Sequence, residues 1–246
     1  MTEEEVLRRT SRSFHLTIRL LPRAVRGDVA LAYLLARATD TLADTSSASA
    51  ERRLGLLRAA RASLDCPEID GYRADDWEKY QREPAERRLL ALVPGLWSRM
   101  HAGDNRLVRA VLGSVIEGQI FDLERFVPDS PPLTAEELER YTWLVAGSVG
   151  EFWTDLCAAR LGDFARAPLE VMRRRGARYG QALQLVNILR DRRMDAALGR
   201  VYIAESEVAR WTDQARVWLR EGMDYCADLR SGRLRYATLL PALLGW

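Results

Sequence analysis

Two pairs of aspartates are the residues whose type and spacing could support chemistry. Asp40 and Asp44 form one Asp-x-x-x-Asp motif, and Asp191 and Asp195 form another. On a helix, a spacing of four places both carboxylates on one face, with about 5–6 Å between Cβ atoms. Two such pairs facing each other would present a ring of oxygen ligands to several Mg²⁺ ions holding a diphosphate. The alternative is that each pair belongs to a solvated helix face.

The apolar sequence before each pair favours a buried position for the acids. Residues Val29–Ala36 precede the first pair and are polar only at the hydroxyl of Tyr33, and the mostly apolar Ala182–Leu189 precedes the second. A helix that is apolar all round is buried, and an unpaired charge is costly there. We therefore expect the carboxylates near the interior, compensated by metal ions or arginines.

Arg37 shares a helical stripe with the first pair. At about 100° per residue, a stripe of roughly 60° of arc holds Tyr33, Arg37, Asp40 and Asp44. An arginine stays charged, and its planar fork binds phosphate through two hydrogen bonds. One interpretation is that Arg37 grips phosphate oxygens while the acids hold metal. The other is an internal salt bridge from Arg37 to Asp40 or Asp44.

The later helix repeats the pattern with amides in place of the arginine. A stripe of about 80° of arc holds Gln184, Asn187, Asp191 and Asp195, so amide and carboxylate oxygens share one face. We interpret this face as one that binds metal or substrate. Alternatively, Gln184 and Asn187 satisfy backbone groups or each other.

A third segment, Tyr141–Gly150, brings small residues and aromatics into one helix. Gly147 and Gly150 predict close packing against another helix, beside an apolar groove with room for a long hydrocarbon.

The chain has no Walker loop, no Gly-x-Gly-x-x-Gly fingerprint, no nucleophile elbow and no clear Ser/His/Asp set. Use of NADPH therefore cannot be read from the residues.

Helices must position these side chains, because alanine, leucine and arginine dominate and no long segment alternates with a period of two. An all-α fold is predicted, with one domain over residues 1–246, since no linker or internal repeat divides the chain. Thr134 and Glu137 predict a capping box at a helix start. The expected helices span about 22–44, 50–64, 84–100, 104–126, 134–162, 168–195, 205–231 and 233–244, with a loop over about 66–76.

Composition narrows the class of protein further. The 246 residues are 48% hydrophobic and carry a net charge of +2, which gives no general case for nucleic acid binding. The three cysteines lack metal-type spacing, as expected of reduced thiols in a cytosol, and two histidines are too few for a histidine-rich metal site. Neither a signal peptide nor a spanning helix is predicted. We expect a cytoplasmic monomer or weak dimer, with peripheral contact to the inner face of the membrane left open.

The sequence resembles the squalene/phytoene synthase family of head-to-head prenyl transferases, and bacterial squalene synthases most. The resemblance covers nearly the whole chain and implies the isoprenoid synthase fold, a helical bundle around a central cavity that takes two farnesyl diphosphates. It rests on four blocks in the family's order. These are Ser11-Arg-Ser-Phe14, Tyr33-x-x-x-Arg37-x-x-Asp40-Thr-Leu-Ala-Asp44, Tyr141-x-x-x-Val-Ala-Gly-Ser-Val-Gly150 and Gln184-x-x-Asn-Ile-Leu-Arg-Asp191-x-x-x-Asp195.

The resemblance also implies roles for individual residues. Catalytic roles fall on Arg37, Tyr33 and Tyr141, the last matching a tyrosine proposed to assist proton removal. The Mg²⁺ ligands fall on Asp40, Asp44, Asp191 and Asp195, with Asn187 beside them. Diphosphate and pocket contacts fall on Ser11, Arg12, Ser13, Phe14, Tyr33, Arg37, Gln184 and Arg190. Val145 and Val149 match tunnel-lining valines, and Gly199-Arg-x-Tyr202 resembles the segment that closes over the site.

The implied reaction joins two farnesyl diphosphates through presqualene diphosphate and forms squalene with NADPH. Phytoene or dehydrosqualene synthesis, a reaction that stops at presqualene diphosphate, and a non-catalytic helical assembly factor of the same fold remain alternatives. The prenyl chain length cannot be read from the sequence.

Three departures from the family pattern stand out. Met194 replaces a glutamate that many squalene synthases carry, and Ala204 stands where a proline is common. The sequence ends at Trp246, where the family normally continues, so we expect the last family helix to be missing. The apolar stretch Leu239–Trp246 then predicts a covering partner, which could be further residues, a bilayer surface or a second copy.

Overall fold

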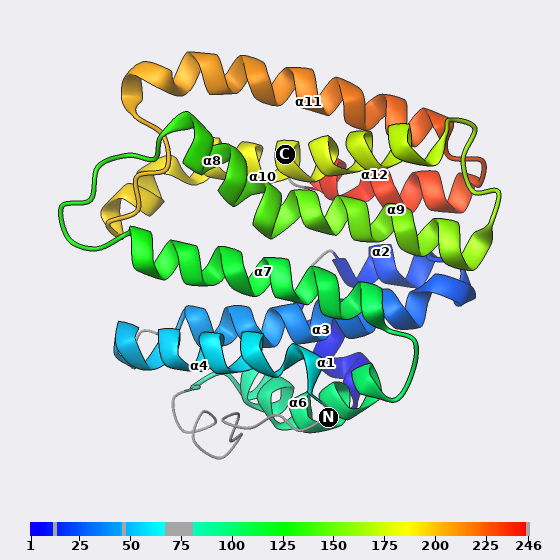
Figure 1. Cartoon of the computed structure of the whole chain (residues 1–246), viewed down its shortest axis with the longest axis horizontal. Helices are drawn as coiled ribbons and strands as arrows, with labels where there is room; N and C mark the ends of the chain where they lie inside the picture. The colour runs from blue at the N-terminus through cyan, green and yellow to red at the C-terminus, as the bar shows by residue number, and fades with distance from the viewer. Residues whose placement is uncertain (12–13, 46–47, 67–80, 245–246) are drawn as a thin grey trace. The chain divides into compact units, whose positions relative to one another are not determined.

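The part of the chain that the structure describes is helical and contains no strand (Figure 1). This computed structural model describes residues 1–11, 14–45, 48–66 and 81–244. The all-α prediction is confirmed. The helices are α1 (Glu3–Thr10), α2 (Phe14–Leu20), α3 (Arg23–Ala43), α4 (Ala50–Ala62), α6 (Pro84–His101), α7 (Arg106–Arg125), α8 (Ala135–Thr142), α9 (Ser148–Leu161), α10 (Leu169–Ala197), α11 (Val208–Asp228) and α12 (Gly232–Leu244). Shorter turns are η1 (Ser63–Asp65), η2 (Trp143–Gly147) and η3 (Glu205–Glu207).

The chain divides into two compact units. The first comprises Met1–Arg19 and Val25–Leu123, and the second comprises Leu20–Ala24 and Glu124–Trp246. The first aspartate motif lies in unit 1 and the second lies in unit 2. That the whole chain forms one domain stays a prediction.

Unit 1 is built around the apolar faces of α3 and α6. Leu34 and Leu35 of α3 and Leu89 and Leu90 of α6 are fully or almost fully buried. Helix α1 packs on α6. Neither α1 nor α2 was predicted; a capping box at Thr2 starts α1 and is the local signal that could have revealed it.

Unit 2 is organised around α10, which packs along both α9 and α11 (Figure 1). Glycines allow the contact with α9 and η2 to be very close. A methyl group at Gly150 would lie 1.9 Å from the carbonyl oxygen of Gly176, and one at Gly180 would lie 2.1 Å from that of Ala146. A methyl group at Gly147 would lie 3.0 Å from the side chain of Gln181 in α10. The predicted close packing at Gly147 and Gly150 is confirmed.

Two predicted helices have different bounds from those expected. The expected helix over 134–162 is α8 and α9 joined by η2, a π-helical turn. Such turns are rare and often occur at functional sites. The capping box at Thr134 is confirmed. The helix expected to reach 231 ends at Asp228, because Leu229 is extended and the next residue, Arg230, donates its N–H to the carbonyl of Phe164 at 2.9 Å.

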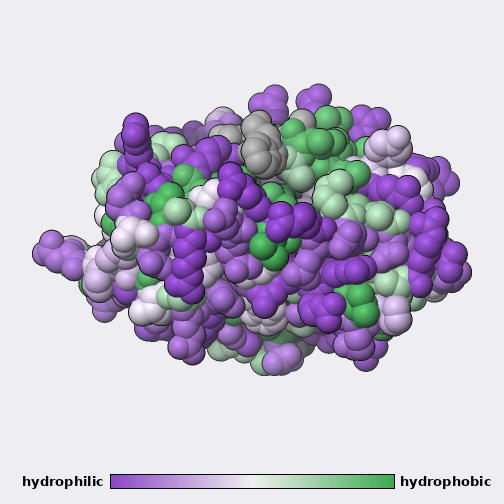
Figure 2. Space-filling model, turned by 90° about the horizontal axis from the view of Figure 1, so that it is seen from above, coloured by the Kyte–Doolittle hydropathy of each residue, from purple (hydrophilic) through white to green (hydrophobic). Residues whose placement is uncertain are grey.

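The surface seen in Figure 2 is largely hydrophilic, with hydrophobic side chains in scattered groups. Among the described helices, none combines the length and the apolar character needed to cross a bilayer. Helix α12 leaves Tyr236 and Leu243 strongly exposed. Gly245 and Trp246, part of the stretch expected to need a covering partner, lie outside the described residues.

Candidate functional site

The first aspartate motif lies at the C-terminal end of α3. Asp40 is in the last turn, and Asp44 directly follows the helix, with its N–H donating to the carbonyl of Asp40 at 2.9 Å. The guanidinium of Arg53, from α4, donates to the carbonyl of Ala43 at 2.6 Å. Helix ends carry carbonyls without helical partners and a partial negative charge, so this cation stabilises the end that carries the motif.

The carboxylates of this motif are more exposed than expected. The preceding Val29–Ala36 segment is mostly buried, as predicted. Asp40, however, has a side chain 42% exposed, and Asp44 is exposed. The expected interior position is therefore wrong for Asp44, whose side chain is exposed although its neighbours Ala43 and Thr45 are buried.

Arg37 forms the salt bridge that was one of the two interpretations. Its Nη1 binds Oδ2 of Asp40, and its Nη2 donates to Oε1 of Glu86 at 3.1 Å. The Nε–H of Arg37 is buried and has no hydrogen-bond partner among the described residues. Burial lowers the pKa of Arg37, but Asp40, Tyr33 and Glu86 raise it, and the net direction is upward. Diphosphate binding by the same guanidinium stays a prediction.

One turn before Arg37, an aromatic pair joins α3 to the start of α2. The hydroxyl of Tyr33 donates to the carbonyl of Thr10 at 3.1 Å, and its ring centroid lies 5.0 Å from that of Phe14. Burial raises the pKa of Tyr33 to about 12, so the phenol remains a hydrogen-bond donor near neutral pH. Ser11, the C-cap of α1, is buried. Arg12 and Ser13 lie outside the described residues.

The second aspartate motif lies near the end of α10 and has a local partner. Arg190 binds Asp191 through Nε at 2.8 Å and Nη2 at 2.7 Å. The side chains are 50% and 34% exposed, and the hydrogen bonds from Arg190 lower the pKa of Asp191. Gln184, Asn187 and Asp195 lie on the same helix and are partly buried.

Tyr141, the residue matched to proton removal, belongs to a buried aromatic group in unit 2. Its ring stacks on that of Tyr202 with centroids 5.2 Å apart, and the two hydroxyls are 3.4 Å apart. The ring of Phe126 meets Tyr202 edge-on at 4.8 Å. Gly199, with φ of +80°, turns the chain after α10 and so delivers Tyr202 to this position. Sequence reasoning placed Tyr202 in a closing segment and missed its contact with Tyr141.

The two valines matched to a tunnel lie in different surroundings. Val145 is partly buried in the π-helical turn η2, and Val149 is 40% exposed on α9. Their role in lining a tunnel stays a prediction, as does a cavity in which the two aspartate motifs face each other.

Within the described residues, no three His, Cys, Asp or Glu side chains come together as a metal site. Each motif supplies a pair of carboxylates. This donor set fits Mg²⁺, which usually takes one or two carboxylates together with substrate phosphates and water. A pair of carboxylates leaves the remaining positions around such an ion to other ligands.

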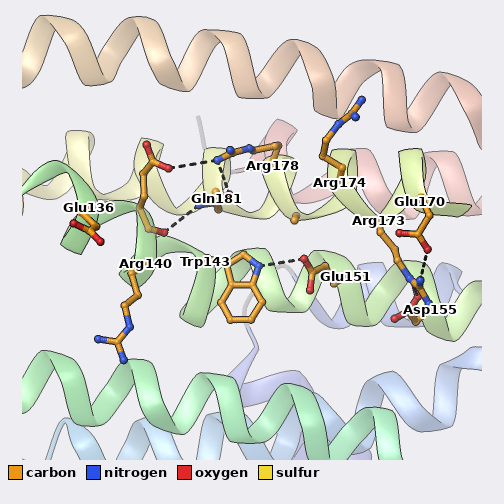
Figure 3. Close-up of a pocket in the computed structure, with 12 residues that line it drawn as sticks. Glu136, Arg140, Trp143, Glu151, Asp155, Glu170, Arg173, Arg174, Arg178 and Gln181 are labelled. Carbon is orange, nitrogen blue, oxygen red and sulfur yellow. Dashed lines mark hydrogen bonds and ion pairs between the residues drawn. The ribbon is translucent and has the colours of Figure 1, made fainter.

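A pocket of about 710 Å³ lies in unit 2 between the α8–η2–α9 segment and α10 (Figure 3). Its acids and arginines largely bind one another. Arg173 binds Asp155 and Glu170, both at 2.5 Å, and Trp143 donates to Glu151 at 3.2 Å. This lining differs from the apolar groove expected beside Tyr141–Gly150, so that groove stays a prediction.

Both aspartate motifs lie within the stretch of the chain that matches a known protein family. The sequence model described as "Squalene/phytoene synthase" matches residues 7–211. The chain belongs to the squalene/phytoene synthase family. This is a family of prenyltransferases of isoprenoid biosynthesis, and the match spans every aspartate of the two motifs.

Individual relatives agree on the family and differ in the reaction they are named for. The chain is 30% identical over 210 residues to a bifunctional lycopene cyclase/phytoene synthase of Colletotrichum graminicola, covering 80% of this chain and 33% of that protein. It is 28% identical over 204 residues to the squalene synthase of Cyberlindnera jadinii, covering 80% of this chain and 44% of that one. The chain thus spans about a third of the length of the first curated relatives it matches.

A solved structure shares the fold over almost the whole chain. The complex of TcSQS with the ligand BPH1237 has a TM-score of 0.76 and 22% identity, covering 99% of this chain and 75% of that chain. This likeness shows the fold alone.

Proposed function

We propose that the chain catalyses the Mg²⁺-dependent head-to-head condensation of two farnesyl diphosphates through presqualene diphosphate, and forms squalene with NADPH. One observation carries the proposal. The family match includes both aspartate motifs, and each motif has an arginine bound to an aspartate of its own helix. Carboxylates for a metal ion and a guanidinium for phosphate oxygens are the two groups that a metal-bridged diphosphate requires.

Magnesium would be held by Asp40 and Asp44 in unit 1 and by Asp191 and Asp195 in unit 2, with Asn187 beside the second pair. When bound, the ions would neutralise the charge on the diphosphate and make it a better leaving group.

Arg37 would assist the first ionisation. In this step the C1–O bond of one farnesyl diphosphate breaks, and the diphosphate leaves with the bonding electrons. The buried Nε–H of Arg37 has no hydrogen-bond partner among the described residues, so a phosphate oxygen that reached it would displace no other bond. The raised pKa of Arg37 keeps the guanidinium charged throughout.

Buried aromatic side chains would protect the cation that remains. The double bond of the second substrate attacks this allylic cation, and loss of one proton closes the cyclopropane of presqualene diphosphate. Tyr141, stacked on Tyr202 in a buried group, would assist removal of that proton. Aromatic faces stabilise cations, and exclusion of water prevents their hydrolysis.

Conversion of presqualene diphosphate to squalene requires a hydride, which NADPH would supply. The chain carries no dinucleotide fingerprint, and we assign no residue to NADPH.

Product analysis tests this proposal directly. The purified protein is incubated with Mg²⁺ and farnesyl diphosphate, with and without NADPH, and the products are separated by mass. We expect presqualene diphosphate without NADPH and squalene with it. No condensation product from farnesyl or geranylgeranyl diphosphate would overturn the enzyme proposal and favour a non-catalytic assembly factor.

A second candidate is phytoene or dehydrosqualene synthesis. It is favoured by the phytoene synthase names of the first curated relatives. Phytoene from geranylgeranyl diphosphate, or dehydrosqualene from farnesyl diphosphate, would identify it.

A further inference from the structure

The guanidinium of Arg37 is held between carboxylates from two helices. Its Nη1 binds Asp40 on α3, and its Nη2 donates to Oε1 of Glu86 on α6 at 3.1 Å. The side chains of Arg37 and Glu86 are 30% and 27% exposed, so this pair is better shielded from water than a typical surface ion pair. No sequence motif pointed to Glu86, which lies 49 residues from Arg37.

Glu86 is itself fixed by the start of α6. Pro84 is the first residue of the helix, and the carboxylate of Glu83 caps it by accepting the N–H groups of Ala85 at 2.5 Å and Glu86 at 3.0 Å. The N-terminus of a helix also favours a negative charge in its first turn. The backbone that carries Glu86 is therefore held by the helix cap, and its carboxylate binds Arg37 in the absence of a ligand.

A second contact from the same region reaches the other side of the first aspartate motif. Gln81 donates to the hydroxyl of Thr45, and that hydroxyl donates to the carbonyl of Thr41 at 2.6 Å. Thr45 is buried and directly follows Asp44. The start of α6 thus binds the chain both before and after the Asp40–Asp44 motif.

The arginine of the second motif binds its aspartate in a different geometry from Arg37. Arg190 binds Asp191 through two nitrogens, the geometry that a guanidinium and a carboxylate readily adopt. Arg37 contacts Asp40 through one nitrogen while Glu86 holds the other. We propose that Glu86 is a positioning residue that prevents Arg37 from pairing with Asp40 through two nitrogens, so that both side chains can engage a metal-bound diphosphate. The nature of the ligand rests on the proposed function.

The test compares Glu86 with a matched acid elsewhere in unit 1. Glu117 of α7 accepts from Arg61 of α4 at 3.0 and 2.7 Å, and both side chains are 42% exposed. For Glu86→Ala, Glu86→Gln and Glu117→Ala, calorimetry measures binding of inorganic diphosphate with Mg²⁺, and kinetics measure KM and kcat for farnesyl diphosphate. We expect Glu86→Ala to weaken binding and raise KM about tenfold, with a smaller change in kcat. Glu86→Gln keeps an acceptor oxygen and should restore most of the affinity, and Glu117→Ala should match the wild type.

A double-mutant cycle separates positioning from a structural role. In an Arg37→Ala background, Glu86→Ala should cause no further loss of diphosphate affinity, because the residue it positions is gone. An equal loss in both backgrounds, or wild-type affinity of Glu86→Ala alone, would overturn the assignment of Glu86. Failure of the wild-type chain to bind diphosphate with Mg²⁺ would instead overturn the proposed function.

Discussion

The two aspartate motifs share one spacing but have different environments. In unit 1, Arg37 lies three residues before Asp40 and also binds Glu86, from a helix far along the chain. In unit 2, Arg190 is the immediate neighbour of Asp191 and binds its carboxylate through two nitrogens. The first arrangement includes a tertiary contact, and the second pairs two neighbouring residues of α10.

The comparison shows that the spacing of a motif identifies candidate ligands. It does not determine whether their side chains are already oriented for binding. A local arginine pair on a half-exposed surface is worth little and can exchange partners at small cost. A guanidinium bound by acids from two helices has its orientation restrained without a ligand. The first motif is therefore expected to be preorganised for the diphosphate, whereas the second would rearrange when the diphosphate binds.

Removal of a motif carboxylate should have the largest effect. We expect Asp40→Asn and Asp191→Asn each to lower turnover by more than about a hundredfold, since ligands should matter at least as much as the groups that orient them. The free energy of unfolding should change by less than about 0.5 kcal/mol, because both side chains are partly exposed. Turnover is measured with farnesyl diphosphate, and wild-type product formation by either variant would contradict the metal assignment.

The buried cysteines of unit 2 provide a fold control for these variants. Burial raises the pKa of Cys157 and raises that of Cys226 to about 12, so both stay protonated near neutral pH. Thiolates are the reactive form, so a thiol reagent should leave both unmodified in the folded protein, whereas Cys66 is exposed. Labelling of Cys157 or Cys226 in Asp191→Asn would show that the substitution disturbed the core of unit 2.

Glycine-to-alanine substitutions should change the stability of the protein differently in the two units. Gly150→Ala should destabilise the protein by about 1–3 kcal/mol, because its methyl group would collide with the backbone of Gly176 in α10. Gly27→Ala on α3 meets no atom within 4 Å and should be neutral or stabilise by up to about 1 kcal/mol. Chemical denaturation measures both, and equal stability of the two variants would contradict the close packing of α9 on α10.

Conservative arginine substitutions test the comparison itself. Arg37→Lys should lower kcat/KM about tenfold, since lysine cannot bind Asp40, Glu86 and phosphate through a planar fork. Arg190→Lys should lower it less, because its pair is local and exposed. Steady-state kinetics on both variants measure kcat/KM and so compare the two arginines. A larger loss for Arg190→Lys would reverse the ranking of the two motifs.

The smallest expected effect is that of liposomes on product release. We propose peripheral membrane contact, since the product is apolar and α12 exposes Tyr236 and Leu243. Liposomes should raise product release a few-fold, and Tyr236→Ser with Leu243→Ser should reduce that gain. Each substituted side chain would remove apolar area worth about 1–3 kcal/mol of binding. Equal rates with and without liposomes would contradict the proposal.

Local periodicity was enough to predict much of the fold. Helix α3 was expected over about 22–44 and spans Arg23–Ala43, and α10 was expected from 168 and begins at Leu169. Apolar spacing and caps act within a few residues, so the sequence records them directly. The glycines of Tyr141–Gly150 likewise predicted a close helix contact, because only a missing side chain permits one.

The environment of the site was decided by tertiary structure. The exposure of Asp44 was not expected, and the partners Glu86 and Tyr202 are brought in from distant segments. Helical spacing could place Arg37 on the same face as Asp40, and it left both a salt bridge and a phosphate contact open. The tertiary structure adds a second acid on the other nitrogen of Arg37, because packing of α6 in unit 1 brings Glu86 to α3.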